Sequence, residues 1–323
     1  MKLAELGEFG LIDRIADQVA ASPSVPLGIG DDAAALLPTP EQLTLITCDM
    51  LLEGVHFDLT FCNPHSLGRK SLAVNISDLA AMGAVPRHCL LGVALPADVP
   101  VEFMDGFMAG MLEMAERHGV TLVGGDTCAS KGGIAISITA LGEQRPERVL
   151  KRSGAKAGDL VYVSGTVGDA AAGLKELMAG RRDGFLVSRQ LDPTPRVAAG
   201  VALAEAGLAS AMIDVSDGIL SDLGHICEMS KIGARIELAR LPLSEEYRVL
   251  CGDDFSLALS GGEDYELLFC VPQGNGEAVE ALFESVGLAV TRIGEIVEGA
   301  GIEVIAPDGG PYTPAGRGFD HFG

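Results

Sequence analysis

Five short stretches of this chain place carboxylates beside glycines or at the ends of predicted strands and helices. Glycine lets the backbone come close to a ligand, and element ends are where polar side chains can gather. Carboxylates collected in this way predict a site for several metal ions, which in turn suggest a highly anionic substrate such as a nucleoside triphosphate. The stretches are GIGDDAA at 28–34, NISDLAAMGA at 75–84, GGDT at 124–127, DVSDG at 214–218 and SGGEDYE at 260–266.

Strand-like and helix-like segments alternate along both halves of the chain, which predicts two α/β domains. A length of 323 residues also favours two domains. The sequence becomes small, polar and basic near KRSGAKAGD at 151–159, so we place the boundary around residues 143–158 and expect domains at 1–145 and 146–323. Expected strands are 43–47, 89–95, 120–123, 134–141, 160–164, 211–214, 265–271 and 290–296, and expected helices are 8–20, 63–82, 100–118, 169–178, 195–206, 216–230 and 276–286.

The charge and cysteine content exclude several classes of protein. A formal net charge of −22 argues against a nucleic-acid surface or an anionic membrane partner. An acidic chain would also repel ATP, unless Mg²⁺ lies between its carboxylates and the phosphates. The seven cysteines show no C-x-x-C spacing, which fits reduced thiols. With neither a signal peptide at the start nor an apolar run of membrane-spanning length, we expect a cytoplasmic protein.

The stretch at 28–33 matches the G-x-G-x-x-A dinucleotide fingerprint, but the following residues AALLPTP are too few for the long helix that such a site needs. Asp31 and Asp32 are therefore interpreted as metal ligands, with a plain acidic turn as the alternative. Asp49 ends an apolar strand, where it could bind a ligand or cap a turn. A lone histidine such as His56 is more often structural than a ligand.

The other acidic stretches differ in how specific they are. Asp78 falls among small apolar residues of a helix, where a carboxylate needs a partner unless it faces solvent. GGDT resembles a tight turn that offers N–H groups to phosphate. DVSDG is stronger, because two aspartates three residues apart converge with Ser216 at a helix N-terminus, which favours phosphate. Arg152 and Lys156 are the clearest phosphate-binding cations, and neither a P-loop nor the protein-kinase motifs are present.

Together with EGVHF at 53–57, RSGAKAGD at 152–159 and GFDHF at 318–322, these stretches make the chain, from residue 7 to its end, resemble the thiamine-monophosphate kinase family. That family belongs to a wider group with aminoimidazole ribonucleotide synthetase, selenophosphate synthetase and the hydrogenase-maturation ATPase. The resemblance implies an N-terminal α/β domain and a C-terminal α+β domain. It also implies a homodimer whose N-terminal sheets join as a β-barrel, with ATP in a cleft beside several Mg²⁺ ions.

The resemblance assigns roles position by position. The implied metal ligands are Asp32, Thr47, Cys48, Asp49, Asp78, Asp126, Asp214 and Asp217. The implied ATP contacts are Gly125, Asp126, Arg152 and Ser216, and the implied thiamine contacts are His56, Glu263 and Phe319. Position 48 usually carries a hydroxyl residue in the family. A cysteine there changes nothing if the contact uses the backbone carbonyl, but weakens one Mg²⁺ ligand if it uses the side chain.

The implied reaction is direct transfer of the γ-phosphoryl group of ATP to the phosphate of thiamine monophosphate. A phosphate monoester has a second pKa of about 6, so the attacking oxygen is already anionic and no general base is required. One alternative is another ATP-dependent enzyme of the same wider group, such as an amidine-forming synthetase. The other is a non-catalytic acidic metal-binding protein, although the chain has no EF-hand loop.

Overall fold

The computed structural model describes residues 1–30, 32–316 and 318–319. The chain forms two compact units. The first comprises Met1–Leu79 with Val85–Pro146, and the second comprises Ala80–Ala84 with Glu147–Gly323. Helix α3 (Pro64–Ala81) therefore begins in the first unit, and its last two residues belong to the second.

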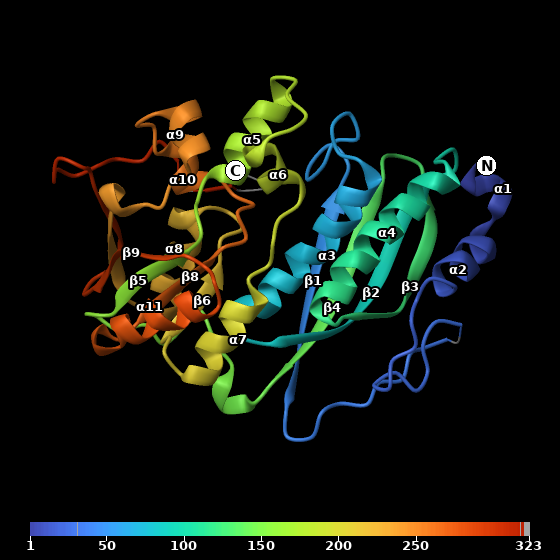
Figure 1. Ribbon diagram of the computed structural model, residues 1–323, viewed down its shortest axis with the longest axis horizontal. Coiled ribbons are helices and arrows are strands. Elements are labelled where there is room, and N and C mark those ends of the chain that lie inside the picture. The colour runs from blue at the N-terminus through green and yellow to red at the C-terminus, as the bar shows by residue number, and fades with distance from the viewer. Residues whose placement is uncertain (31, 317, 320–323) are drawn as a thin grey trace. The chain divides into compact units, whose positions relative to one another are not determined.

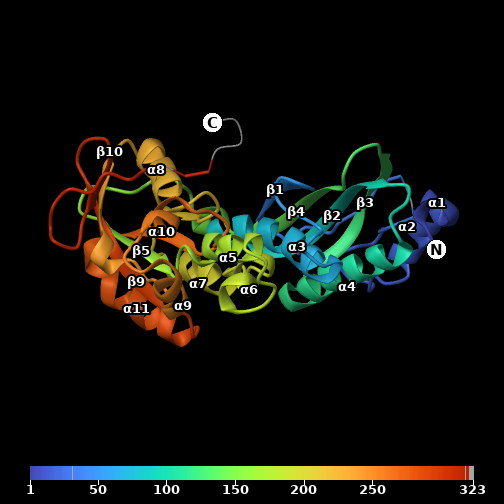
Figure 2. The same ribbon diagram turned by 90° about the horizontal axis from the view of Figure 1, so that it is seen from above.

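A four-stranded sheet in the order β1-β4-β2-β3 forms the centre of the first unit. β4 runs antiparallel to both β1 and β2, whereas β2 and β3 are parallel. Helices α3 and α4 cover one face of this sheet (Figures 1 and 2). The elements are α1 (Leu3–Leu6), α2 (Glu8–Ala16), β1 (Leu43–Leu52), α3 (Pro64–Ala81), β2 (Val85–Pro96), α4 (Val101–His118), β3 (Thr121–Ser130), β4 (Ala135–Gln144) and η1 (Pro146–Arg148), whose last two residues lie in the second unit.

Two glycines allow α3 and α4 to pack closely. A Cβ atom at Gly68 would lie 1.9 Å from the carbonyl oxygen of Phe107, and one at Gly110 would lie 1.9 Å from that of His65. Helix α4 also presents a row of buried methionines to the core, and it ends at Gly119 in the left-handed conformation. This tight packing fixes α3, which carries part of the candidate site.

The sheet face opposite α3 and α4 carries exposed apolar side chains. On β1, alternate residues point to opposite faces. Leu45 and Leu51 are buried, whereas Ile46 is 67% exposed and Met50 is 56% exposed. Large apolar side chains exposed together on one strand are typical of a surface that another molecule covers.

The second unit contains a six-stranded sheet in the order β10-β7-β9-β5-β8-β6. β10 and β7 are parallel, and the other neighbouring strands are antiparallel. Its strands are β5 (Leu160–Ser164), β6 (Ala211–Asp214), β7 (Gly233–Glu237), β8 (Leu267–Val271), β9 (Val290–Val297) and β10 (Gly301–Ile305). Its helices are α5 (Asp169–Met178), α6 (Phe185–Leu191), α7 (Val197–Ala206), α8 (Ile219–Ser230), η2 (Leu238–Arg240), α9 (Glu245–Cys251), α10 (Ser256–Ser260), η3 (Gln273–Asn275) and α11 (Gly276–Ser285).

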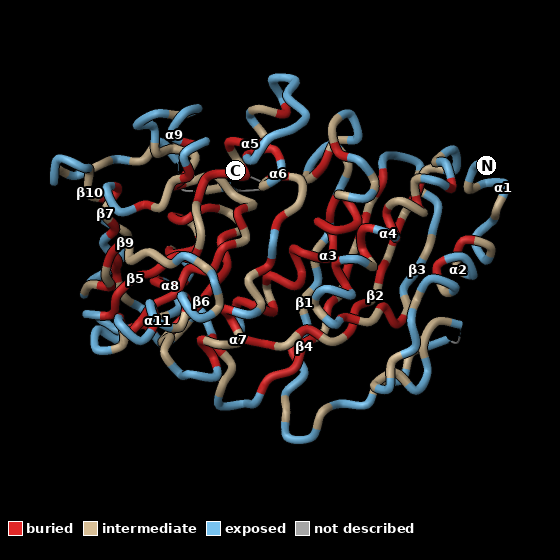
Figure 3. Tube along the Cα trace, in the orientation of Figure 1, coloured by how far each residue is buried: buried red, intermediate tan, exposed pale blue. Residues whose placement is uncertain are grey.

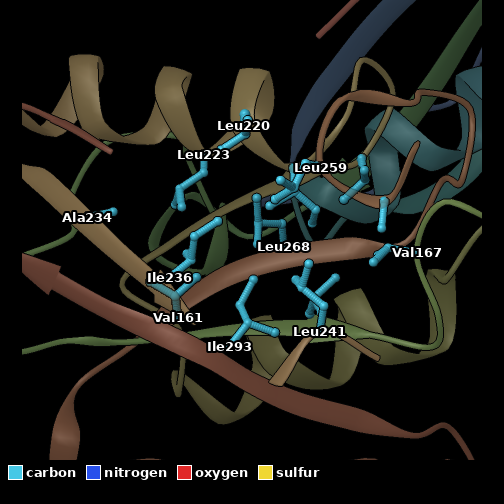
Figure 4. Packing of buried hydrophobic residues seen from close by; sticks show 14 of the residues in the cluster. Val161, Val167, Leu220, Leu223, Ala234, Ile236, Leu241, Leu259, Leu268 and Ile293 are labelled. Carbon is cyan, nitrogen blue, oxygen red and sulfur yellow. The ribbon is translucent and has the colours of Figure 1, made fainter. Parts of the chain in front are cut away.

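This larger sheet is buried on both faces. Val161 and Val163 of β5 belong to a core formed with α8, while Leu160 and Tyr162 of the same strand belong to a core formed with α7 and α11. Figure 4 shows the first core, with Leu223 of α8 close to strand side chains, and Figure 3 shows the buried strands of this unit. Burial on both faces explains why β5 and β8 read as continuous apolar runs instead of alternating patterns.

Most of the expected elements form, and the α/β class is confirmed for both units, each built on a mixed sheet. Two differences affect the site: β1 and β3 are both longer than expected, so Asp49 and the GGDT stretch lie inside strands. Among the described residues, none of the helices combines the length and the apolar composition needed to cross a membrane.

Candidate functional site

The first group of predicted site residues forms where β1 meets α3. Thr47 and Asp49 are two residues apart on β1 and therefore face the same side of the sheet, toward α3. The hydroxyl of Thr47 donates a hydrogen bond to Oδ2 of Asp78. The backbone N–H of Asp49 donates to Oδ1 of Asn75 at 3.1 Å, and Asn75 is fully buried. These two hydrogen bonds between β1 and α3 thus hold Asp49 and Asp78 beside each other.

The two carboxylates of this group destabilise each other when both are charged. Burial, and after it the nearby charge of Asp78, raise the pKa of Asp49 from 3.8 to about 6. A cation between the two groups would reverse this effect, because it favours the charged form of both. The donor set, two carboxylates with a threonine hydroxyl, consists of the oxygen ligands that Mg²⁺ prefers.

The structure corrects the expected position of Asp49 at the end of a strand. β1 pairs with β4 along its whole length, from Leu43 opposite Gln144 to Leu52 opposite Ala135. Polar residues are tolerated in the middle of β1 because it is an edge strand with only one neighbour. Strand alternation also puts the thiol of Cys48 on the opposite face from Asp49, with its sulfur 3.5 Å from the hydroxyl of Ser137.

Asp126 lies apart from Asp49 within the chain. GGDT is part of β3 and not a tight turn, and Asp126 is exposed opposite Gly92 of β2. β1 and β3 are the two edges of the sheet, three strand spacings apart, which corresponds to about 14 Å. One metal ion therefore cannot bind Asp49 and Asp126 of the same chain.

Asp32 lies in the segment between α2 and β1, and Asp31 lies outside the described residues. This segment is attached to the sheet at two points. Glu143 of β4 accepts hydrogen bonds from the backbone N–H of Thr39 at 2.9 Å and from its hydroxyl at 2.5 Å, and Ser24 is 2.8 Å from Nε2 of His88. Residues 32–42, which follow the glycines of this stretch, contain no helix.

His56 follows β1 in a turn that holds its ring in place. Its Nδ1 accepts a hydrogen bond from the backbone N–H of Leu52 at 3.0 Å. In a neutral ring, the proton is then on Nε2, the nitrogen that can donate to a ligand. The histidine is half-buried, so this turn gives it a fixed orientation near the end of the strand that carries Asp49.

In the second unit, the backbone brings DVSDG and SGGEDYE together. The N–H of Glu263 donates to the carbonyl oxygen of Ser216 at 2.8 Å, and the N–H of Tyr265 donates to that of Val215 at 2.9 Å. A Cβ atom at Gly262 would lie 2.2 Å from the carbonyl oxygen of Ser216, so only glycine allows this approach. These two stretches, far apart in the sequence, therefore form one unit of structure.

Phe319 of the C-terminal motif also contacts the DVSDG turn, whereas Arg152 lies away from it. The N–H of Phe319 donates to the carbonyl oxygen of Asp217 at 3.1 Å, and residues 320–322 of GFDHF lie outside the described residues. Arg152 is exposed, and its carbonyl oxygen is 3.4 Å from the hydroxyl of Ser230. Ser230 ends α8, whose 12 residues extend about 18 Å from the DVSDG turn.

Asp222 is a residue of this group that the sequence analysis did not identify. Its Oδ2 accepts hydrogen bonds from the N–H groups of Asp217 and Gly218, each at 3.1 Å. Burial, and after it the charge of Asp214, raise the pKa of Asp222 to about 8. Its only sequence signal is an aspartate in the first turn of a helix that directly follows a D-G turn.

The remaining carboxylates of SGGEDYE serve the fold. Asp264 is buried and accepts hydrogen bonds from the N–H groups of Gly168 and Ala170, at 2.5 and 3.0 Å. Glu266 is fully buried and forms ion pairs with Arg189 at 2.8 Å and Arg196 at 2.5 Å. Such buried, fully paired carboxylates stabilise the segment but are not open to a metal.

Each unit by itself therefore brings candidate carboxylates together in pairs. Over the part of the chain that the structure describes, no three histidine, cysteine, aspartate or glutamate side chains are grouped closely enough to hold a metal ion by themselves. Mg²⁺ in phosphate-transfer sites usually takes only one or two carboxylates and completes its coordination with water and substrate phosphates. The pair Asp49 and Asp78 and the group around Asp214 and Asp222 match that arrangement.

Comparison with known proteins agrees with these motifs. Residues 30–144 match the family model of the AIR synthase related protein N-terminal domain, and residues 156–307 match that of the C-terminal domain. Thiamine-monophosphate kinase of Escherichia coli strain K12 is 44% identical over 328 residues, covering 98% of each chain. The enzyme of the same name from Bacillus subtilis strain 168 is 33% identical, covering 98% of this chain and 100% of the relative.

Solved structures give the same result. The crystal structure of thiamine-monophosphate kinase from Stenotrophomonas maltophilia K279a superposes with a TM-score of 0.85 at 40% identity, over 97% of this chain and 99% of that one. A structure of AaThiL complexed with AMPPCP and TMP superposes with a TM-score of 0.76 at 34% identity, over 99% of both chains. Escherichia coli HypE, at 23% identity and a TM-score of 0.81, shares the fold. By sequence and by structure, the chain belongs to the thiamine-monophosphate kinase family.

Proposed function

We propose that this protein transfers the γ-phosphoryl group of ATP to the phosphate of thiamine monophosphate, giving thiamine diphosphate and ADP. The observation that carries the proposal is the 44% identity over 98% of the chain to a thiamine-monophosphate kinase, with each motif of the site in place. The complex of a 34% identical relative with AMPPCP and TMP supports an ATP-like donor and this acceptor.

Paired carboxylates support a role for several Mg²⁺ ions, with ATP as co-substrate. Bound Mg²⁺ would supply positive charge that offsets the negative charge of the transferred phosphoryl group. The side chains of Cys48 and Asp49 lie on opposite faces of the sheet, so the thiol of Cys48 is on the face away from Asp49. This favours the backbone carbonyl of Cys48, and not its thiol, as the group that contacts the metal. The residues that we propose to hold the metals are Asp32, Thr47, Cys48, Asp49, Asp78, Asp126, Asp214 and Asp217.

The chain's own residues then orient two anionic substrates. We assign the nucleotide contacts to Gly125, Asp126, Arg152 and Ser216, and the thiamine contacts to His56, Glu263 and Phe319. Because Arg152 lies along α8 away from the DVSDG turn, it suits a part of the nucleotide other than the transferred phosphate. No general base is assigned, because the phosphate monoester that attacks is already ionised at neutral pH, its second pKa being about 6.

The two sheet edges support a homodimer in which the N-terminal sheets of two chains close into a β-barrel. The uncovered face of the first sheet carries Ile46 and Met50, and its edge strands β1 and β3 have one neighbour each. A barrel would cover this face and remove both edges. If β1 pairs with the partner's β3, Asp126 of the partner subunit would lie near Asp49, which Asp126 of the same chain cannot reach.

A complementation assay tests this arrangement. Asp49→Asn and Asp126→Asn homodimers should each be inactive. When the two variants are unfolded together and refolded as mixed dimers, one site regains both carboxylates if the residues come from different chains, so activity should return. If each site uses Asp49 and Asp126 of one chain, every site in the mixture carries a substitution and activity stays absent.

We also propose that the functional domains divide between residues 145 and 146 and that the protein works in the cytoplasm. Its proposed substrates and the lack of any C-x-x-C spacing among its cysteines support this location.

The activity itself is tested by incubating the purified protein with ATP and Mg²⁺, with and without thiamine monophosphate, and separating the products by chromatography. Thiamine diphosphate formed in equal amount to ADP supports the proposal. ADP release that does not depend on thiamine monophosphate would refute it.

A further inference from the structure

Two residues in strained backbone conformations flank Asp264 in the SGGEDYE stretch. Glu263 has a φ of 71° and Tyr265 a φ of 51°, in the left-handed region that side chains with a Cβ atom rarely adopt. Such conformations persist only where the surrounding structure holds them, and they are concentrated at sites that clamp ligands. The left-handed conformation of Glu263 therefore indicates that the direction of its side chain matters for binding a ligand.

Two sets of hydrogen bonds hold residues 263–265 in place. Asp264, between the strained residues, is 1% exposed and accepts the N–H groups of Gly168 and Ala170 at the start of α5. The N–H groups of Glu263 and Tyr265 are bonded to carbonyl oxygens of the DVSDG stretch. The backbone on either side of Asp264 is thus tied to two other parts of the second unit.

Helix α6 provides the contact to the Glu263 side chain. The side-chain amide of Gln190, a residue only 4% exposed, donates a hydrogen bond from Nε2 to Oε2 of Glu263. The preceding residue, Arg189, donates to Oε1 of Glu266 at 2.8 Å. Two consecutive residues of α6 therefore bind the two glutamates of one segment.

The chemistry of these two contacts differs. Glu266 faces two guanidinium groups, those of Arg189 and Arg196, which neutralise its charge. Gln190 is neutral and donates an N–H from its side-chain amide to the carboxylate of Glu263, which it thereby orients. An oriented carboxylate accepts hydrogen bonds, and the aminopyrimidine ring of thiamine carries N–H donors.

We propose that Gln190 is a positioning residue for the thiamine acceptor. It holds the Glu263 carboxylate in the direction that receives the acceptor, while the left-handed backbone of Glu263 aims the side chain toward α6. The inference rests on the proposed function, in which Glu263 contacts thiamine. It predicts that Gln190 affects the binding of thiamine monophosphate and leaves the binding of ATP unchanged.

The test measures kcat and the KM of each substrate for Gln190→Ala and Gln190→Glu, with Ser188→Ala, an exposed substitution on the same helix, as the matched control. We expect Gln190→Ala to raise the KM for thiamine monophosphate about tenfold, equivalent to about 1.4 kcal/mol. The KM for ATP and kcat should stay within about twofold of the unsubstituted protein, as should all values for the control. Gln190→Glu should raise the KM for thiamine monophosphate further, because it faces Glu263 with a like charge.

Combining Gln190→Ala with Glu263→Ala in a double variant distinguishes the ways in which the proposal could fail. If Gln190 acts through Glu263, then Gln190→Ala has no additional effect on KM in the Glu263→Ala protein. If Glu263→Ala raises the KM for thiamine monophosphate but Gln190→Ala does not, the positioning role is refuted and the proposed acceptor contact stands. If Glu263→Ala leaves this KM unchanged in an active enzyme, both the contact and the inference are wrong. An equal rise in both KM values for Gln190→Ala also overturns the inference, because it indicates a general structural effect.

Discussion

Replacing Asp49 by asparagine should stabilise the metal-free protein while it abolishes activity. The side chain keeps its shape and loses its charge, so the repulsion between Asp49 and Asp78 disappears. The hydrogen bond from the backbone N–H of residue 49 to Asn75 is not altered by the change. A site built to bind cations is expected to lower the stability of the empty protein in this way.

The pKa of Asp49 sets the size of the effect. It is raised from 3.8 to about 6, first by burial and then by the charge of Asp78. At about 1.4 kcal/mol for each pH unit, the ionised carboxylate costs the folded state up to about 3 kcal/mol at pH 7. Asp49 keeps some contact with water, which screens the charge, so we expect the asparagine variant to be more stable by about 1–2 kcal/mol.

The sign of the pH dependence follows from the direction of the shift. A carboxyl group whose pKa is higher in the folded state stabilises the fold fully below the unfolded value of about 3.8 and loses this contribution as the pH rises through about 6. The difference in stability between the two proteins should therefore be small near pH 4, grow up to about pH 6, and then stay constant.

The assay is urea unfolding in the presence of EDTA from pH 4 to pH 8, with the exposed Asp98→Asn as the control. Addition of Mg²⁺ with a non-hydrolysable ATP analogue should stabilise the unsubstituted protein more than the variant. An Asp49→Asn protein that is equally or less stable than the unsubstituted protein at pH 7 would refute the reasoning about the carboxylate pair.

Two further predictions concern the fold. Burial lowers the pKa of His88, so as the pH falls the unfolded chain takes up the proton before the folded protein does, and the free energy of unfolding should decrease below about pH 6.5. His88→Gln should make the free energy of unfolding, measured with urea, depend less on pH in this range. An unchanged pH dependence would contradict this role of His88. A Cβ atom at Gly200 would lie 2.1 Å from the carbonyl oxygen of Ala80, so Gly200→Ala should lower the free energy of unfolding by about 1–3 kcal/mol. Gly224→Ala, in a helix with open space around it, should instead raise that free energy by up to about 1 kcal/mol, and similar effects of both changes would contradict the packing argument.

The sequence predicted much of the fold because its helices and buried strands carry clear local signals. α5 and β6 form where periodicity and apolar runs indicate them, and α4 ends at the expected glycine. The short helices α6 and α9 were missed, since seven residues give too little periodicity to recognise. The extent of β1 was missed because Cys48 and Asp49 look like the start of a turn, and only the pairing with β4 reveals a continuous strand.

The candidate site was predictable in its residue types but not in its arrangement. Motif spacing identified DVSDG and SGGEDYE, whereas their backbone pairing is a long-range contact that no local pattern encodes. The same limit applies to Gln190, whose role depends on how α6 packs against the segment that carries Glu263. Asp264 and Glu266 cannot be told apart from Glu263 by sequence pattern. In the structure, however, both are buried, with Asp264 bonded to backbone N–H groups and Glu266 to arginines.

The central claim is direct phosphoryl transfer, and the most direct test follows the label from ATP that carries ³²P in its γ-phosphate. The purified protein is incubated with this ATP, Mg²⁺ and thiamine monophosphate, and the products are separated. The account predicts that the label appears in the terminal phosphate of thiamine diphosphate, in an amount equal to the ADP formed, and that EDTA or Asp49→Asn prevents this. Label recovered as inorganic phosphate, with no labelled thiamine diphosphate, would contradict it.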